Sequence, residues 1–232
     1  MTTSTADARA LRDPSPLWAW LRVLIVIYML ASAAATAANS AYEWAGGADP
    51  NFTPETPNDL TLLLALLASG VTGFIAFLLC VFFTCRLTFR LMKNLHELNA
   101  GDVSISPGWA VGFYFIPFVN LYWPMKAVAE IWRGTFAELD GQADARDPRG
   151  QIGWWWAFWI LGNALENIGN RVEGGGLFTP PPQPPSEQQL SIAVACWGVS
   201  EIFTLLCCIF MLRVFGKLTK AQAGLVRVEA VA

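Results

Sequence analysis

Four long apolar runs, separated by polar segments, dominate the pattern along the chain. They cover residues 17–38, 60–85, 152–170 and 190–212. About 20 consecutive apolar residues are enough for a helix to cross a bilayer, so the pattern predicts four transmembrane helices. Residues 1–16 form a polar N-terminus, expected to be disordered, and residues 221–232 form a C-terminal tail. We therefore expect an all-α membrane protein with a single helical membrane domain over residues 17–220.

A fifth apolar stretch, residues 108–139, is interrupted by Pro117, Asn120 and Pro124. Proline removes a backbone donor and clashes with the preceding helical turn. Ser106 and Pro107 suit the start of a short helix, and Pro124 suits the first turn of a second one. The stretch is therefore predicted to be a Pro-broken hairpin that is re-entrant or interfacial and leaves on the side it entered. A Pro-kinked crossing helix is the alternative.

The distribution of Lys and Arg favours the hairpin. If residues 108–139 crossed the membrane, the 15 basic residues would divide seven against eight between the two sides. If they do not cross, every basic residue except Arg171 falls on one side. Basic residues are enriched in cytoplasmic loops, so this topology places both termini in the cytoplasm. The predicted location is the cell (cytoplasmic) membrane, with the chain crossing it several times.

The first apolar run has a second interpretation. Arg9 and Arg12 precede it and small residues end it, as in a secretory signal peptide. The run is longer than the usual signal core of about 7–15 residues. A retained first span is therefore the prediction, and either outcome leaves the rest of the chain oriented in the same way.

Composition agrees with a membrane location, because 54% of residues are hydrophobic and only 14% are charged. A soluble domain has about 25% charged residues. The formal net charge of −3 gives no overall attraction to nucleic acid.

The lipid bilayer is the predicted partner, and the Gly- and Pro-rich loop at 171–189 suggests a protein partner or a second copy. The five cysteines lie in or at the ends of apolar runs, as small packed residues do.

Polar side chains inside the apolar runs are the candidate functional residues. Four of them share one face of the third run at i, i+3, i+4 and i+7: Asn163, Glu166, Asn167 and Asn170. Glu201 lies near the middle of the fourth run. The favoured interpretation is that these groups hydrogen-bond helices together and so hold the bundle. An intramembrane carboxyl group is costly and suggests a functional site, so the alternative is a proton- or cation-linked site formed by Glu201, the Asn163 face and Asn120.

A basic segment follows the second run, with Leu87, Leu91, Leu95 and Leu98 on one face. It is interpreted as a helix that lies on anionic lipid.

Residues 78–86 also resemble residues 205–213 at an offset of 127, and the similarity continues to residue 93. Such a match suggests a parallel internal repeat, although Leu, Phe and Cys coincide easily in apolar segments.

Signatures of catalysis are lacking in the sequence. His96 is the sole histidine, which excludes an H-E-x-x-H zinc site in one chain, and there is no P-loop or G-x-S-x-G motif. We therefore expect no catalytic residue, no metal and no cofactor, and a protein that is not an enzyme.

Several motifs together resemble a known family. They are Gly108-Trp-Ala-Val-Gly112, Phe115-Ile-Pro-Phe-Val-Asn-Leu-Tyr-Trp-Pro124, Glu130-Ile-Trp132, Trp154-Trp-Trp-Ala-Phe-Trp159 and Asn163. This set resembles a bacterial membrane family catalogued only as a domain of unknown function. The resemblance implies a multi-pass bacterial envelope protein and carries over no site residues.

The expected function is a non-catalytic organiser or regulator of membrane partners, and the alternative is a small proton- or cation-linked transporter or channel component.

Overall fold

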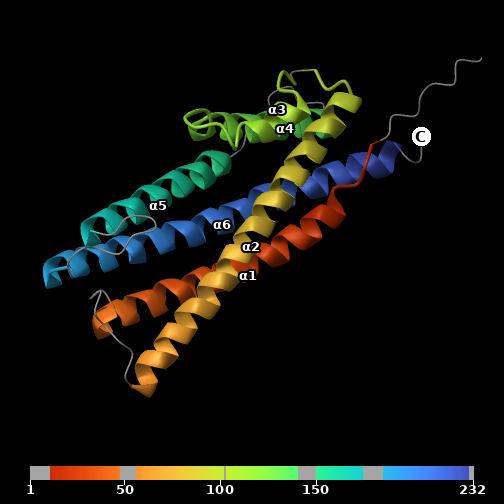
Figure 1. The fold of residues 1–232 in the computed structure, drawn as a ribbon. Coiled ribbons are helices and arrows are strands. Elements are labelled where there is room, and N and C mark those ends of the chain that lie inside the picture. The colour runs from red at the N-terminus through yellow and green to blue at the C-terminus, as the bar shows by residue number, and fades with distance from the viewer. Residues whose placement is uncertain (1–10, 48–55, 102, 141–149, 175–184, 230–232) are drawn as a thin grey trace, which may run out of the picture. The chain divides into compact units, whose positions relative to one another are not determined.

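The computed structural model describes residues 11–47, 56–101, 103–140, 150–174 and 185–229. Every regular element in these ranges is helical, which confirms the predicted all-α fold (Figure 1). In chain order they are α1 (Ser15–Tyr42), the π-helical η1 (Glu43–Gly47), α2 (Pro57–Glu97), α3 (Pro107–Gly112), the 3-10 helix η2 (Val119–Leu121), α4 (Trp123–Asp140), α5 (Gln151–Glu173) and α6 (Glu187–Glu229). Residues 1–10 of the predicted disordered N-terminus and 175–184 of the Pro-rich loop lie outside the described residues.

Among the described residues, three helices rather than the predicted four are long and apolar enough to cross a membrane. They correspond to Ser15–Ala45, Pro57–Glu97 and Glu187–Glu229. Helix α5 covers the third predicted span but is not one of these three helices, and neither is any helix of the hairpin formed by α3, η2 and α4. Helix α5 carries Asn163, Glu166, Asn167 and Asn170 together with four Trp residues. Polar side chains have unfavourable transfer free energies in a bilayer, so they offset the apolar residues of this helix.

The two longest helices begin with reciprocal caps. At the start of α2, Thr56 Oγ1 accepts from Asp59 N (3.2 Å) and Asp59 Oδ2 accepts from Thr56 N (3.1 Å). Ser186 and Gln189 form the same arrangement at the start of α6. Such capping boxes satisfy orphan N–H groups of the first turn. The sequence therefore fixes both starts locally.

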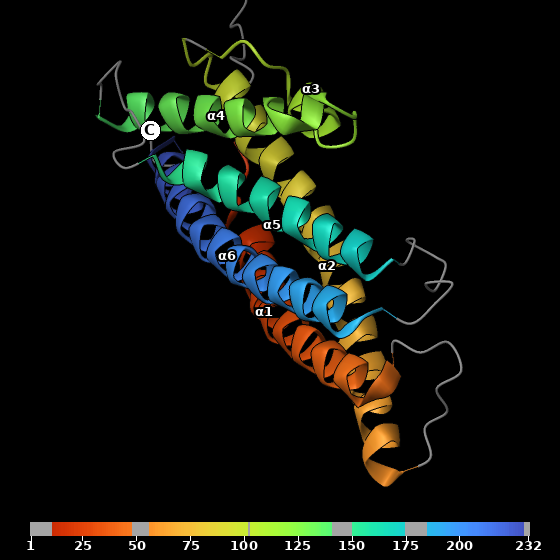
Figure 2. The same ribbon diagram turned by 90° about the vertical axis from the view of Figure 1, so that its left-hand side faces the viewer.

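The chain divides into two compact units. Unit 1 comprises Met1–Arg22, Val81–Gly153 and Phe210–Ala232, and unit 2 comprises Val23–Cys80 and Trp154–Ile209. In unit 1, α3 lies beside α4, and in unit 2, α5 runs antiparallel to α6 (Figures 1 and 2). Helices α1, α2 and α6 each contribute residues to both units.

The prediction that the basic segment after the second run forms a helix lying on the lipid surface is wrong. Helix α2 continues without a break to Glu97, and Leu87, Leu91 and Leu95 are completely buried in the core of unit 1. Burying an aliphatic side chain contributes roughly 1.5–3 kcal/mol. The leucine stripe therefore packs against protein, and only the basic face of this segment remains open.

The C-terminal part of α6 has a matching burial pattern. Helix α6 is helical through Glu229, so most of the predicted tail at 221–232 belongs to this helix. At the offset of 127 found in the sequence, buried positions of α2 correspond to buried positions of α6, in the pairs Leu87 and Val214, Thr88 and Phe215, Leu91 and Leu218, Met92 and Thr219, and Leu95 and Gln222. The two helix ends thus contribute to the core of unit 1 in the same register, as the interpretation of a repeat requires.

Buried polar groups join four segments of unit 1. Asn94 Nδ2 donates to Gln222 Oε1 (3.0 Å), and Gln222 Nε2 donates to Leu91 O (3.0 Å) and to Thr135 Oγ1 (2.9 Å). Asn94 also bonds both main-chain groups of Arg12. Buried polar groups are costly unless they are hydrogen-bonded, so this network specifies how α2, α4, α6 and the segment before α1 meet.

Glu130 forms a second polar anchor and explains part of the Glu130-Ile-Trp132 motif. Its side chain is only 3% exposed. The carboxylate accepts from the backbone N–H groups of Ser104 and Ile105, the latter at 2.9 Å. The spacing of Lys126, Glu130 and Arg133 suggests surface ion pairs, but Glu130 instead holds the loop between α2 and α3, because two backbone donors there need an acceptor.

The predicted break at Pro117 and Pro124 is present. Ser106 caps α3, with Pro107 in the first turn, and α4 begins at Trp123. Between them, Phe118 has φ of 63°, and Val119 N donates to Pro117 O (2.8 Å). This is a γ-turn with positive φ, which is a strained conformation for a residue other than glycine. The Phe118 side chain is 86% exposed at this turn.

We predict that Gln222→Ala lowers the free energy of unfolding by about 1–3 kcal/mol, because buried partners on α2 and α4 lose their hydrogen bonds. Thermal and denaturant unfolding of the purified protein in detergent measures this. Gln188→Ala is the matched control, since Gln188 lies exposed on the same helix. Equal stability of the two variants would contradict the role of the network.

Candidate functional site

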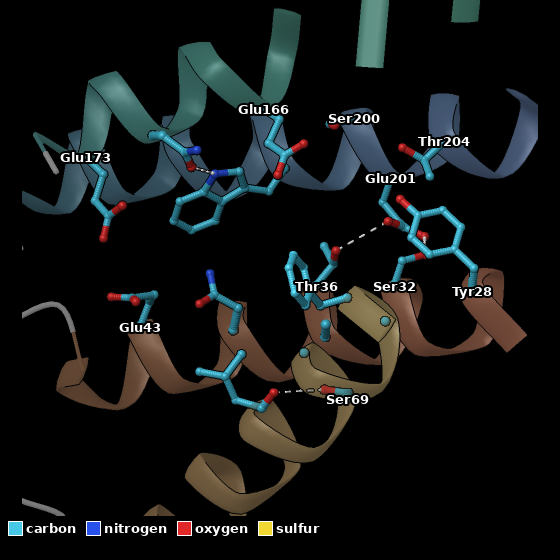
Figure 3. A pocket seen from close by; sticks show the side chains of 18 residues that line it. Tyr28, Ser32, Thr36, Glu43, Ser69, Glu166, Glu173, Ser200, Glu201 and Thr204 are labelled. Atoms are coloured by element: carbon cyan, nitrogen blue, oxygen red, sulfur yellow. Dashed lines mark hydrogen bonds between the residues drawn. The ribbon is translucent and has the colours of Figure 1, made fainter. Parts of the chain in front are cut away.

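Unit 2 contains a cavity of about 410 Å³ (Figure 3). Side chains from α1, η1, α2, α5 and α6 line it. Those from α1 and α6 include Tyr28, Ser32, Thr36, Asn39, Trp197, Ser200, Glu201 and Thr204. Helix α2 contributes mainly small residues, Ser69, Gly70 and Gly73, which leave open space on that side.

The charges that line the cavity are all acidic. They belong to Glu43, Glu166, Glu173 and Glu201, and no Lys, Arg or His is among the lining residues. Within the described part of the chain, no three His, Cys, Asp or Glu side chains come close enough together to hold a metal ion. The carboxylates are therefore distributed along the cavity rather than gathered at one point, as Figure 3 shows.

Glu201 is held between two helices. Ser32 Oγ donates to Glu201 Oε1 (2.9 Å), and Thr36 Oγ1 lies 3.4 Å from Glu201 Oε2 and donates to it. Ser32 and Thr36 are one helical turn apart on α1, so both hydroxyl groups face α6. Each carboxylate oxygen thus has one neutral donor and retains capacity to accept a further donor or to bind a cation.

Glu43 and Glu173 lie at the other end of the cavity from Glu201 in Figure 3. One carboxylate oxygen of Glu43 is buried and has no hydrogen-bond partner among the described residues. At this end of the cavity, fewer hydrogen bonds offset the cost of burying a carboxyl group than at Glu201.

One wall of the cavity depends on close packing of α5 and α6. Trp197 Nε1 donates to Asn170 Oδ1 (2.9 Å), and Ser200 Oγ donates to Gly162 O (2.9 Å). A Cβ atom at Gly169 would lie 2.7 Å from Trp197 Nε1 and 2.9 Å from Trp197 Cδ1. Glycine at this position therefore allows the indole to reach Asn170.

The structure brings together only part of the predicted site. Glu166 and Asn170 line the cavity with Glu201, whereas Asn163 and Asn167 do not. These two side chains are exposed and donate to carbonyl groups of their own helix, Trp159 O and Asn163 O, both at 2.7 Å. Gly162, Glu166 and Gly169 lie on the side of α5 that faces α6. The four polar residues predicted from the sequence therefore lie partly on this side and partly on the exposed side of the helix.

Asn120, predicted to complete the site, belongs to unit 1 and is not among the lining residues. Its backbone N–H donates to Ile116 O (3.0 Å) within the turn. Pro117, Asn120 and Pro124 thus shape the hairpin.

Sequence reasoning missed the residues of α1 and η1. Ser32, Thr36 and Glu43 contribute hydroxyl and carboxyl groups to the cavity. The available signal was their spacing, since Tyr28, Ser32 and Thr36 are polar residues repeated every four positions in an otherwise apolar run. Such a stripe marks a face that avoids lipid.

We predict that Gly169→Ala destabilises the protein by about 1–3 kcal/mol, because the added methyl group overpacks against Trp197. Thermal unfolding in detergent measures the effect. Gly198→Ala is the control, because nothing lies within 4 Å of a Cβ atom there, and a helical Gly→Ala change gains up to about 1 kcal/mol. A Gly169→Ala variant as stable as Gly198→Ala would refute the close packing.

Comparison with known proteins identifies a family. The model of a family described as a domain of unknown function (DUF4328) matches residues 59–217. These residues extend from the first turn of α2 into α6, and α1 with Ser32 and Thr36 lies before them. No curated protein and no solved structure matches the chain.

Proposed function

Because the chain belongs to the DUF4328 family, whose function is unknown, we propose a function from its own geometry: a non-catalytic membrane protein that binds a proton or small cation in the acidic cavity of unit 2. It would act as a proton- or cation-linked transporter or channel component. The observation that carries this proposal is a cavity among candidate membrane spans with four carboxyl groups and no basic side chain.

Chemistry supports this choice of ligand. Carboxylate and hydroxyl oxygens are the donors that hard cations prefer. Acidic residues within membrane spans mark ion and proton pathways, and they face the bundle interior or a wet cavity. Glu201 meets this description, since it projects from α6 between two hydroxyl groups of α1.

The second candidate is a non-catalytic organiser or regulator of membrane partners. The same two hydrogen bonds of Glu201 support it, because they join α1 to α6 and such contacts stabilise helix bundles. In that case Glu201 would act through its hydrogen bonds alone, and its ability to ionise would not matter.

Glu201→Gln separates the two functions. Glutamine keeps an oxygen that can accept from Ser32 and removes the ionisable group. We expect proton flux into proteoliposomes, followed with an enclosed pH-sensitive dye under a potassium diffusion potential, to fall to the level of protein-free liposomes. Thermal unfolding in detergent checks that the variant is folded.

Glu187→Gln is the matched control, since Glu187 lies exposed in the first turn of α6 and outside the cavity. Asn120→Ala should also retain wild-type flux. If the wild-type protein carries no proton or cation flux, or if Glu201→Gln retains it, the transport proposal fails. Loss of stability without loss of flux would favour the organiser.

We also propose that the chain crosses the cell membrane four times, with α5 as the third span and both termini in the cytoplasm. The charges of the two units support this topology. Unit 2 contains Arg171 as its one basic residue and eight acidic residues, whereas unit 1 contains the other fourteen basic residues. Basic residues accumulate on the cytoplasmic side, so these fourteen residues would lie on that side.

The hairpin of α3, η2 and α4 is proposed to be interfacial or re-entrant. Its turn exposes large apolar side chains, namely Phe115, Ile116, Phe118, Leu121, Tyr122 and Trp123. Aromatic side chains are favoured at the boundary between lipid and water. The hairpin would therefore insert this turn into the membrane from the cytoplasmic side.

Cysteine labelling tests the topology. In a variant whose five native cysteines, all free, are replaced by alanine, single cysteines are placed at Arg146 and Gln183, which lie outside the described residues. We expect an impermeant maleimide to label Gln183→Cys in intact cells and Arg146→Cys only after permeabilisation. Arg227→Cys and Arg171→Cys serve as controls for the inner and outer sides. Labelling of both test positions from one side would show that α5 does not cross.

A further inference from the structure

Unit 1 contains a second, smaller cavity of about 140 Å³ whose charged lining is entirely basic. Its lining consists of Arg12, Arg86, Phe89, Arg90, Lys93 and Asn94. No acidic residue lines it, and no ion pair joins any of the four cations to another described residue. Four like charges around one small space repel one another, so their arrangement needs an explanation.

Three of the cations come from one face of α2. Arg86, Arg90 and Lys93 are spaced at i, i+4 and i+7, which places them side by side along the helix. The adjoining face, with Leu87 and Leu91, is buried in the core of unit 1. Rotation of α2 to separate these charges from Arg12 would expose that core, so their position is fixed by packing.

Asn94 brings the fourth cation to this face. Its side chain is 3% exposed. Arg12 N donates to Asn94 Oδ1 (3.2 Å), and Asn94 Nδ2 donates to Arg12 O (3.0 Å). The segment before α1 is thus held through its main chain, and the guanidinium of Arg12 stays available. The neighbouring Asp13 does not neutralise the cluster, because it does not line the cavity and its carboxylate accepts from Ser15 N (2.9 Å).

We propose that this basic cluster is a binding site for a phosphate group. Guanidinium groups match the oxygens of phosphate in paired hydrogen bonds, and the lysine adds a point charge. The phosphate could belong to an anionic lipid headgroup or to a soluble phosphate compound. Arg86 directly follows the apolar run at 60–85, and basic residues in that position contact lipid headgroups. The exposed ring of Phe89 adds an apolar wall.

Ligand-dependent thermal unfolding of the full chain in a neutral detergent tests the proposal. The probes are short-chain phosphatidic acid, short-chain phosphatidylcholine and inorganic phosphate. A ligand that binds only the folded protein raises its melting temperature in a saturable way. We expect this rise with phosphatidic acid, weakened by about fivefold for each cation removed.

The main variants are Arg12→Gln and Arg86→Gln, alone and combined. Arg12→Gln leaves the main-chain hydrogen bonds to Asn94 in place, so it removes charge without removing the anchor. Arg133→Gln is the matched control, since Arg133 is exposed on α4 of the same unit and does not line the cavity.

Stabilisation by phosphatidic acid alone would identify a lipid headgroup, and equal stabilisation by inorganic phosphate would identify a soluble ligand. Four results would overturn the proposal. The first three are no stabilisation by phosphatidic acid or inorganic phosphate, unchanged affinity in the Arg12→Gln/Arg86→Gln variant, and an equal loss of affinity in Arg133→Gln. Stabilisation by phosphatidylcholine equal to that by phosphatidic acid would also overturn it, because the site would then not depend on net negative charge.

Discussion

The packing of unit 1 depends on one buried contact, the hydrogen bond between the side-chain amides of Asn94 and Gln222. Each amide has further partners, so the pair joins α2, α4, α6 and the segment that precedes α1. Leucine side chains can pack in several registers, whereas a buried amide is satisfied in very few. The amide pair therefore selects one arrangement among the many that the apolar residues alone would allow.

That arrangement has a direct consequence for charge. Because Asn94 also holds the main chain of Arg12, the polar core places a fourth cation beside the basic face of α2. In unit 2, neutral hydroxyl groups play the corresponding part, since Ser32 and Thr36 hold Glu201 among the other carboxyl groups of the cavity. In unit 1 a neutral side chain thus keeps like charges close together, and in unit 2 neutral hydroxyl groups hold one carboxyl group in an acidic cavity.

The two proposed sites have opposite signs, and so do the units that contain them. Nearly all basic residues lie in unit 1, whereas unit 2 has a large excess of acidic residues. The positive-inside rule describes such a separation of charge between the two sides of a membrane. It therefore supports the proposed topology, in which α5 would cross although its hydropathy does not identify it as a span.

The sequence by itself determined the helical class, the limits of α1 and α5 to within a few residues, the N-cap of α3 at Ser106, and the break at Pro117 and Pro124, because periodicity, capping and proline act over a few neighbouring residues. It also identified Glu201 and Glu166 as unusual. Only the tertiary structure decided that the Leu87 stripe faces protein rather than lipid, that Glu130 binds a loop, and that Ser32 and Thr36 rather than Asn163 meet Glu201. These outcomes depend on contacts between residues as much as 169 positions apart, and the partner of a polar or apolar face cannot be inferred from the pattern of that face alone.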